Sequence, residues 1–349
     1  MNDPVPVPQN NYYLFKSCIA GSIYPGIEIA VKSILDKIGA DYTDDPAQSS
    51  CTGFGFFKGV VPIETNLALN ARNLSLAAAD ENKNVVCVCP TSYNNLKHSK
   101  KLISKEKDVE GKIKEIFHDL GLEYDYSPEI SHISDVFLAR IDEIVQHAVA
   151  SLSGLRVVTH HGCQYTKFFF QDVTSGTFEN PTVLDNILKK FDCEVIEYSE
   201  KFLCCGGGLH NSLYNPEYSR EIAAKKLQSI YQVKPDLIVT QCPGCTFNLE
   251  YYQESALSEL NETVSGEPSD LGEVLGSDSG EQFVSGEVSE PIPDQTSVPD
   301  KMITQGVPVL YISELISLLL GEDPCEVGVD MHVVPVEPLL EKIFREDKH

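Results

Sequence analysis

The feature that most constrains the fold is an internal repeat of cysteine motifs at a fixed offset. The tripeptide Cys51-Thr52-Gly53 lies 153 residues before Cys204-Cys205-Gly206, and the Cys-Pro step at Cys89 lies 153 residues before the one at Cys242. In both halves the Cys-Pro step follows an apolar run. A repeat that keeps one register over such distances predicts two copies of one structural unit.

Local patterns within each half favour a mixed α/β unit. Apolar runs typical of strands fall at residues 12–19, 84–89, 155–163, 193–198 and 236–242. Segments with helical spacing of apolar residues fall at 25–39, 64–79, 182–191 and 217–230. Because strands that alternate with helices favour parallel sheets, we predict an α/β fold of two duplicated cysteine-rich lobes with parallel-type sheets, residues 1–150 and 151–349.

One acidic segment departs from this pattern. Residues 253–300 hold twelve Asp or Glu and no Lys or Arg, together with repeated Ser, Gly and Pro. Such a composition buries too little apolar surface to offset the entropy of ordering, so we expect a disordered insertion in the second lobe. It supplies much of the imbalance between 52 acidic and 27 basic residues in the whole chain.

Charge and hydropathy exclude several classes of protein. A net charge of −25 without a basic patch disfavours nucleic acid as a partner. The longest apolar run, near residues 315–320, is far shorter than the ~20 residues that span a bilayer, so we predict a soluble, cytoplasmic protein without a membrane span. Eleven cysteines without a secretory signal favour metal or redox chemistry over a disulfide framework.

The cysteines fall where parallel sheets place their functional sites. Cys18, Cys89, Cys163 and Cys242 each follow a predicted strand, and cavities in such folds lie beyond the carboxyl ends of the strands. We therefore expect one pocket in each half.

The second half offers five thiols at three predicted strand ends. They are Cys163, Cys204, Cys205, Cys242 and Cys245. Thiolates select iron–sulfur clusters, zinc or cuprous copper. Because a tetrahedral zinc site takes four ligands, the fifth cysteine points to a cluster of unusual nuclearity or to a ligand that leaves during turnover.

Neighbouring residues suit such a site. Gly206, Gly207 and Gly244 would let the backbone approach an inorganic core, with N–H groups available to cluster sulfurs. His160 and His161 either donate a proton to a departing thiolate or hydrogen-bond the ligands.

Three lysines near these cysteines in the sequence have two possible roles. Lys167, Lys225 and Lys226 would attract an anionic substrate, although lysines on amphipathic helices are usually solvated.

The complete cysteine pattern resembles the cysteine-rich CCG domain of the B-type subunit of heterodisulfide reductase. The resemblance covers nearly the whole chain outside the acidic segment, and includes His160 to Cys163, Arg72 and the run from Val307 to Leu310. It implies a noncubane 4Fe-4S cluster ligated by the five cysteines of the second half. It also implies reduction of the mixed disulfide of coenzyme M and coenzyme B, as in methanogens.

The first half departs from that pattern at Thr52 and Ser92, where the family has cysteines. Cys18, Cys51 and Cys89 remain, and Cys87 is a candidate fourth thiolate because it lies two residues before Cys89 on the predicted strand. These thiols suit an ordinary iron–sulfur cluster or zinc, with a hydroxyl or His98 completing the shell, and an empty site is the alternative.

Electrons have to come from a partner, because the sequence has neither a ferredoxin cysteine run nor a Gly-x-Gly-x-x-Gly fingerprint. The resemblance implies a C-type partner, which is a ferredoxin-like iron–sulfur subunit, and an A-type partner, which is a flavin-bearing subunit. Two alternatives stay open. One is a related protein with another thiol substrate, such as the E-type subunit of succinate dehydrogenase, and the other is a non-catalytic electron-relay subunit.

Overall fold

Two four-stranded parallel sheets form the framework of the protein. The computed structural model describes residues 7–49, 51–80, 84–166, 173–208, 211–265 and 305–344. The first sheet has the order β2-β1-β3-β4 and the second the order β6-β5-β7-β8, and every strand pair is parallel. The strands are β1 Tyr12–Phe15, β2 Tyr42–Thr43, β3 Asn84–Cys87, β4 Glu129–His132, β5 Arg156–His160, β6 Glu194–Val195, β7 Leu237–Thr240 and β8 Val309–Tyr311. The predicted α/β fold with a duplicated sheet is confirmed.

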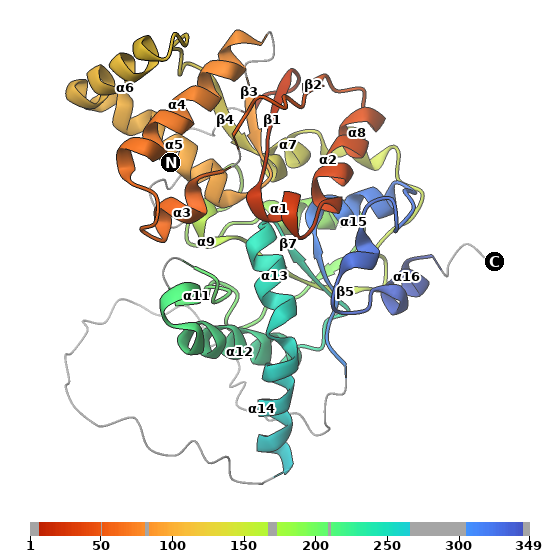
Figure 1. Cartoon of the computed structure of the whole chain (residues 1–349). Coiled ribbons are helices and arrows are strands. Elements are labelled where there is room, and N and C mark those ends of the chain that lie inside the picture. The colour runs from red at the N-terminus through yellow and green to blue at the C-terminus, as the bar shows by residue number, and fades with distance from the viewer. Residues whose placement is uncertain are drawn as a thin grey trace, which may run out of the picture.

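Helices connect successive strands and lie around both sheets (Figure 1). In the first half they are α1 Cys18–Ser22, α2 Gly26–Lys37, α3 Gly53–Phe57, α4 Ile63–Ala79, α5 Pro90–Lys105, α6 Lys107–Asp119, α7 Ile133–Ala139 and α8 Ile141–Val145. In the second half they are α9 Cys163–Thr166, α10 Val183–Lys189, α11 Asn211–Tyr214, α12 Pro216–Gln232, α13 Pro243–Tyr251, α14 Gln253–Ser265, α15 Ile312–Leu319 and α16 Glu337–Ile343, with a 3-10 turn at Val329–Met331. No helix in the described part of the chain is long and apolar enough to cross a membrane.

Burial explains why these segments form central strands. β1 and β7 are buried at every residue, as expected for parallel strands covered by helices on both faces. α2 shows the matching helical pattern, because it buries Ile27, Val31 and Ile34 on one side. The predicted strand at residues 12–19 stops early. Ser17 caps α1 by accepting from the Ala20 N–H at 3.3 Å, so Cys18 begins a helix.

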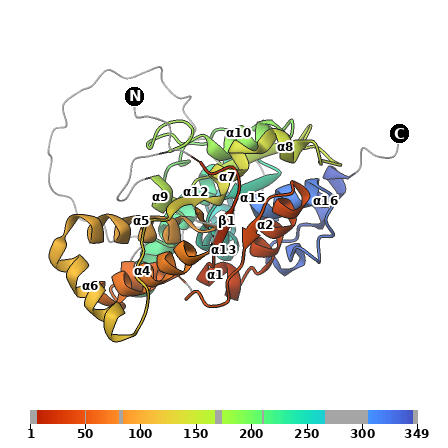
Figure 2. The same cartoon turned by 90° about the horizontal axis from the view of Figure 1, so that it is seen from above.

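The two halves exchange the helices that directly follow their last strands. α7 follows the last strand of the first sheet and packs on α10, whereas α15 follows the last strand of the second sheet and packs on α2 (Figure 2). Ser313 of α15 donates to the Ile27 carbonyl at 2.9 Å. One hydrophobic cluster therefore includes buried residues of both halves, such as Ile34 and Leu315. The predicted boundary at residue 150 stays a prediction.

The start of the acidic segment is helical, which corrects the expectation of disorder from residue 253. α14 covers Gln253–Ser265 and buries Ala256 and Leu260 against the rest of the second half. Gln253 pairs with the backbone of Val307 at 2.7 and 2.8 Å. The average composition concealed two apolar residues spaced four apart, which place one helical face on the core. Residues 266–300 lie outside the described residues.

Candidate metal centre

The cysteines gather where the carboxyl ends of the two sheets face each other. Cys89 and Cys242 follow β3 and β7 and are the N-cap residues of α5 and α13. Cys18 begins α1 and Cys163 begins α9. α1 packs on α13, so these strand ends belong to one region between the halves (Figure 1).

The second half contributes a connected set of thiols, which we call the second sulfur group. It consists of Cys163, Cys204, Cys205, Cys242 and Cys245. Hydrogen bonds link Cys204 to Cys163 and to Cys205, and link Cys245 to Cys205 and to Cys242. A ring nitrogen of His160 and the sulfurs of Cys205 and Cys245 all lie within 4.8 Å of one another. The structure thus brings together all five predicted ligands from three separate stretches of chain.

These contacts favour thiolates at two of the five positions. Hydrogen bonds from Cys163 and Cys205 hold the pKa of Cys204 well below its usual range. Hydrogen bonds from Cys245 and Cys89 do the same for the pKa of Cys242. Since a metal binds thiolate rather than thiol, this donor set is chemically suited to a soft metal or an iron–sulfur core.

The loop that carries Cys204 and Cys205 contains glycines at positions where a Cβ would lie too close to neighbouring atoms. Gly206 has φ +90°, and a Cβ there would lie 2.3 Å from the Ser219 carbonyl oxygen. A Cβ on Gly208 would lie 3.0 Å from the Cys204 sulfur. A Cβ on Gly207 would meet Asn248 at 3.1 Å. The close approach predicted for this loop is therefore an approach to helices α12 and α13 as well as to the sulfurs.

Polar side chains of α12 and α13 hold the same loop. Asn248 donates to the Cys205 carbonyl at 2.9 Å, and Ser219 donates to the Gly206 carbonyl at 2.6 Å. Lys226 is buried and donates to the carbonyls of Glu200, Lys201 and Leu203. The expectation that Lys226 is solvated is wrong, because this helix face covers the loop. Lys225 is largely exposed, and Lys167 lies outside the described residues.

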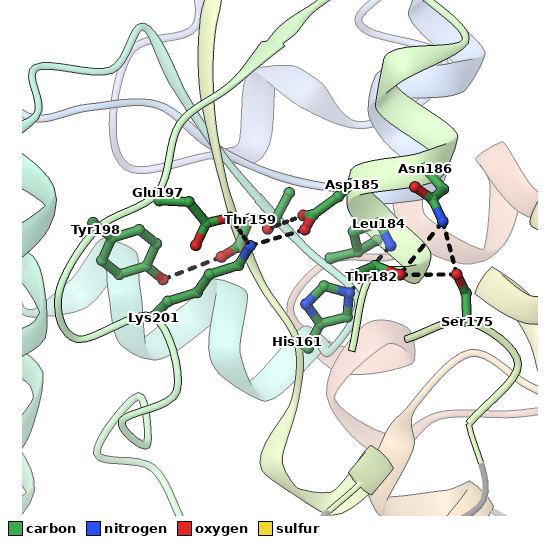
Figure 3. A network of polar contacts seen from close by, with 10 residues as sticks. All are labelled: Thr159, His161, Ser175, Thr182, Leu184, Asp185, Asn186, Glu197, Tyr198 and Lys201. Atoms are coloured by element: carbon green, nitrogen blue, oxygen red, sulfur yellow. Dashed lines mark hydrogen bonds and ion pairs between the residues drawn. The ribbon is translucent and has the colours of Figure 1, made fainter. Parts of the chain in front are cut away.

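A buried ion pair involves the chain just before this loop (Figure 3). Lys201 Nζ lies 2.8 Å from Asp185 Oδ2 and 2.8 Å from Glu197 Oε1, and its side chain is 1% exposed. Asp185 also accepts from the Thr159 hydroxyl on β5. The pair joins α10, the chain before Cys204 and the strand that leads to Cys163.

The two predicted proton donors have different surroundings. His161 Nε2 accepts from the Leu184 N–H of α10 at 3.1 Å (Figure 3), and burial lowers the pKa of His161 to about 4. Its ring is therefore neutral and turned to the helix. His160, beside Cys205 and Cys245, is the histidine that touches the second sulfur group.

The first half has a smaller set of thiols, the first sulfur group, formed by Cys18, Cys51 and Cys89. Cys18 and Cys51 share a hydrogen bond that lowers the pKa of Cys18 to about 7. Cys89 is hydrogen-bonded to Cys242 of the second half. Burial raises the pKa of Cys87, and this thiol packs in the hydrophobic cluster that includes Tyr13 and Val86.

A buried amide network occupies the place of the missing cysteine at Thr52. The Thr52 hydroxyl lies 2.6 Å from Asn66 Oδ1, to which it donates, and accepts from Asn95 Nδ2 at 3.1 Å. Asn66 and Asn95 are both at most 1% exposed. The Thr52 hydroxyl therefore makes its hydrogen bonds with buried side chains of the protein. Ser92, at the other missing position, hydrogen-bonds the Cys51 sulfur, but the hydrogen bond with Cys18 and burial outweigh it and raise the pKa of Cys51 well above its usual range.

The two sulfur groups adjoin each other through the hydrogen bond between Cys89 and Cys242, and the expectation of one pocket in each half stays a prediction. A Cβ on Gly162 would lie 3.0 Å from Pro90 Cγ and 3.2 Å from Cys242 Cβ. A Cβ on Gly244 would lie 3.3 Å from Ile19 Cδ1, so this glycine admits the first half as well. The exchange of helices brings the two sheet edges together, and no local sequence pattern reports such contacts.

Comparison with known proteins agrees with this geometry. The family model of the CCG cysteine-rich domain matches the chain twice, at residues 12–97 and 157–250. The chain belongs to this family of cysteine-rich CCG-domain proteins. It is 27% identical to the B-type subunit of ferredoxin:CoB-CoM heterodisulfide reductase from Methanosarcina acetivorans over an alignment of 346 residues, which covers 96% of this chain and 97% of that protein.

The chain is also similar to a protein of another named complex and to one solved structure. The membrane anchor subunit of 8-methylmenaquinol:fumarate reductase from Wolinella succinogenes is 23% identical over 336 residues, 95% of this chain and 99% of that one. A hypothetical protein from Helicobacter pylori has a similar fold, with a TM-score of 0.62 and 14% identity. That likeness covers 95% of this chain and 53% of the other, so the chain spans about half of that protein.

Proposed function

We propose that this chain is the iron–sulfur subunit of a heterodisulfide-reductase-type complex, with a noncubane 4Fe-4S cluster held by the second sulfur group. The observation that carries the proposal is the convergence of Cys163, Cys204, Cys205, Cys242 and Cys245 on one place. Five thiols exceed the four ligands of a tetrahedral zinc ion. The similarity to the heterodisulfide reductase protein of Methanosarcina acetivorans over nearly the whole chain supports the same assignment.

The reaction proposed is the reduction of a mixed disulfide of the CoM-S-S-CoB type. Two electrons and two protons convert the disulfide into two thiols. A bound cluster would supply electrons one at a time. The protein's own residues hold the ligand loop through Asn248 and Lys226, and His160 places a ring nitrogen beside the sulfurs, where it can hydrogen-bond a thiolate.

The electrons would come from other subunits. The relative from Methanosarcina acetivorans is named as one lettered subunit of a ferredoxin:CoB-CoM heterodisulfide reductase. We propose a ferredoxin-like partner of the C type and a flavin-bearing partner of the A type, and a cytoplasmic location for the complex. Co-purification of the chain with both partners from its native host would test the assignment.

The cluster itself is tested by anaerobic purification. We expect iron and acid-labile sulfide in stoichiometric amounts, and an EPR signal of the oxidised protein that changes when thiol substrates are added. Protein that contains neither iron nor sulfide would refute the cluster. A spectrum indifferent to thiols would refute substrate binding at iron.

A non-catalytic relay subunit is the second candidate. It is favoured by Thr52, whose hydroxyl is tied to Asn66 and Asn95 where a complete copy has a cysteine. The fumarate reductase protein of Wolinella succinogenes shows that similar chains occur in complexes with other named reactions. A thiol-independent spectrum combined with full iron content would select this candidate.

A further inference from the structure

A lysine of the first half lies buried beside the ligand loop of the second half. Lys58 is the C-cap residue of α3, which directly follows Cys51 and Thr52. Its residue is 2% exposed. Lys58 Nζ donates to Ser212 Oγ of α11 at 2.6 Å, and Tyr214 of the same helix donates to the Lys58 carbonyl at 3.3 Å. These contacts fix the ammonium group across the boundary between the halves.

The ammonium group has few partners for a buried charge. Besides Ser212, it lies 5.2 Å from the ring centre of Phe54. Among the residues that the structure describes, no carboxylate lies within ion-pair distance of Lys58. By contrast, Lys201 is neutralised by Asp185 and Glu197. An ammonium without a counter-ion is costly to bury, so an anionic neighbour is expected.

Two thiols of the second sulfur group, Cys204 and Cys205, are the acidic groups that interact with the charge of Lys58. α11 begins three residues after Gly208, where a Cβ would lie 3.0 Å from the Cys204 sulfur, so the contact with Ser212 brings Lys58 to the ligand loop. Burial lowers the pKa of Lys58, whereas the nearby thiols of Cys204 and Cys205 raise it. Each thiolate ligand adds a negative charge, and removing those charges from water has to be offset by nearby cations or dipoles.

We propose, given the cluster proposed above, that Lys58 supplies a fixed positive charge from the first half to the cofactor held by the second half and thereby raises its reduction potential. The degenerate half is then part of the electrostatic environment of the complete one. A cation near a cluster stabilises the reduced form, which carries one more negative charge.

The test compares Lys58→Met, which keeps an apolar stem and removes the charge, with Lys58→Arg, which keeps the charge. Ser212→Ala is the matched control, because it removes the hydrogen-bond acceptor and leaves the ammonium. Each anaerobic preparation is analysed for iron and sulfide, checked for folding by circular dichroism, and titrated by EPR-monitored reduction.

We expect Lys58→Met to weaken electron affinity at least tenfold, a shift of about 59 mV to more negative potential for one electron. The electron affinity of Lys58→Arg and of Ser212→Ala should stay within about threefold of the wild type, because both variants keep the positive charge. Such a change is clearly smaller than the tenfold change expected when the charge is removed. Loss of iron in Lys58→Met with retention in Lys58→Arg would equally support the role of charge.

Other results would overturn the inference. Lys58→Met with full iron and an unchanged potential shows that the charge does not act on the cofactor. Loss of iron in both Lys58 variants shows that shape, rather than charge, is required. Iron-free wild-type protein would overturn the proposed function itself, so the iron content of the wild type distinguishes the two failures.

Discussion

The two halves share one topology, yet they differ in what they bury beside their cysteines. The second half places the Cys205 thiol among other thiols, whereas the first half places the Thr52 hydroxyl among Asn66 and Asn95. At the same offset, Asn248 of the second half still holds the Cys205 carbonyl. The fold around the two positions is therefore the same, although Cys205 is surrounded by thiols and Thr52 by side-chain amides.

Charged pairs show the same divergence. Asp185, Glu197 and Lys201 correspond to Lys32, Asp44 and Gln48 at the offset of 153 residues. The Lys201–Asp185 pair is 1% and 6% exposed, whereas the Lys32–Asp44 pair is 34% and 32% exposed. The same set of positions thus carries a buried charge pair in the complete half and a more exposed one in the degenerate half, although the lysine has moved: Lys201 corresponds to Gln48, and Lys32 corresponds to Asp185.

The largest expected effect separates the two sulfur groups. Cys205→Ala removes a thiol at the centre of the second group, so we expect loss of the thiol-dependent EPR signal and a fall in disulfide reduction of at least tenfold. Thr52→Ala, its counterpart, should leave both unchanged. Survival of the signal in Cys205→Ala would contradict the assignment of the second group.

The Cys89→Ser variant tests whether the first sulfur group binds a metal. If the first sulfur group holds iron or zinc, this change should lower the metal content per chain, because it removes one of three thiols there. Since Cys89 also contacts Cys242, the EPR signal of the second group serves as the control. Unchanged metal content would indicate an empty first group.

The buried ion pair should outweigh its solvated counterpart. Lys201→Met leaves Asp185 as an uncompensated buried charge, which typically costs about 3–5 kcal/mol of unfolding free energy. Lys32→Met removes an exposed pair and should cost at most about 1 kcal/mol. Denaturant unfolding of both variants under identical metal loading measures the difference, and equal losses would refute the distinction.

A smaller, pH-dependent difference involves the C-terminal segment. His332 Nδ1 lies 3.0 Å from Glu250 Oε1, and its Nε2 lies 3.3 Å from Glu314 Oε2. Burial lowers the pKa of His332, but the two glutamates outweigh it and raise the pKa to about 10. In the first half Glu250 corresponds to Lys97 at the offset of 153 residues, and Glu314 corresponds to Asp135 at an offset of 179 residues.

Because the folded-state pKa lies above the unfolded value near 6.5, protonated His332 stabilises the fold fully below that pH. The contribution declines as pH rises towards 10. His332→Gln should be less stable at pH 6 and should lose this dependence between pH 7 and 10. Parallel stability curves for the variant and the wild type would argue against a charged His332.

Much of the framework could be predicted from the chain itself. The register between Cys51 and Cys204 reports the duplication, and the apolar runs before Cys89 and Cys242 report the central strands. The exchange of α7 and α15 escaped this register, although Ile133-Ser134-Asp135 reappears as Ile312-Ser313-Glu314, because the second copy is 179 residues further on rather than 153. The acidic segment between the two copies conceals the match.

Buried lysines were the least predictable part of the site. Lys58 and Lys226 lie in short polar interruptions of apolar segments, and such residues usually face solvent. Their burial depends on contacts with other segments, which are Ser212 for Lys58 and the carbonyls of Glu200, Lys201 and Leu203 for Lys226. In the structure, Asn73 at the corresponding position of the first half also binds the loop before its cysteine, through Ser49.

The exchanged helices also bear on how such a chain can evolve. α15 completes the interior around α2, and α7 does the same for α10. Cysteines of one copy can therefore be substituted without exposing the core, but deletion of that copy would remove a helix that covers the other. Both copies of such a duplicated gene are retained, even after one of them has lost ligand residues.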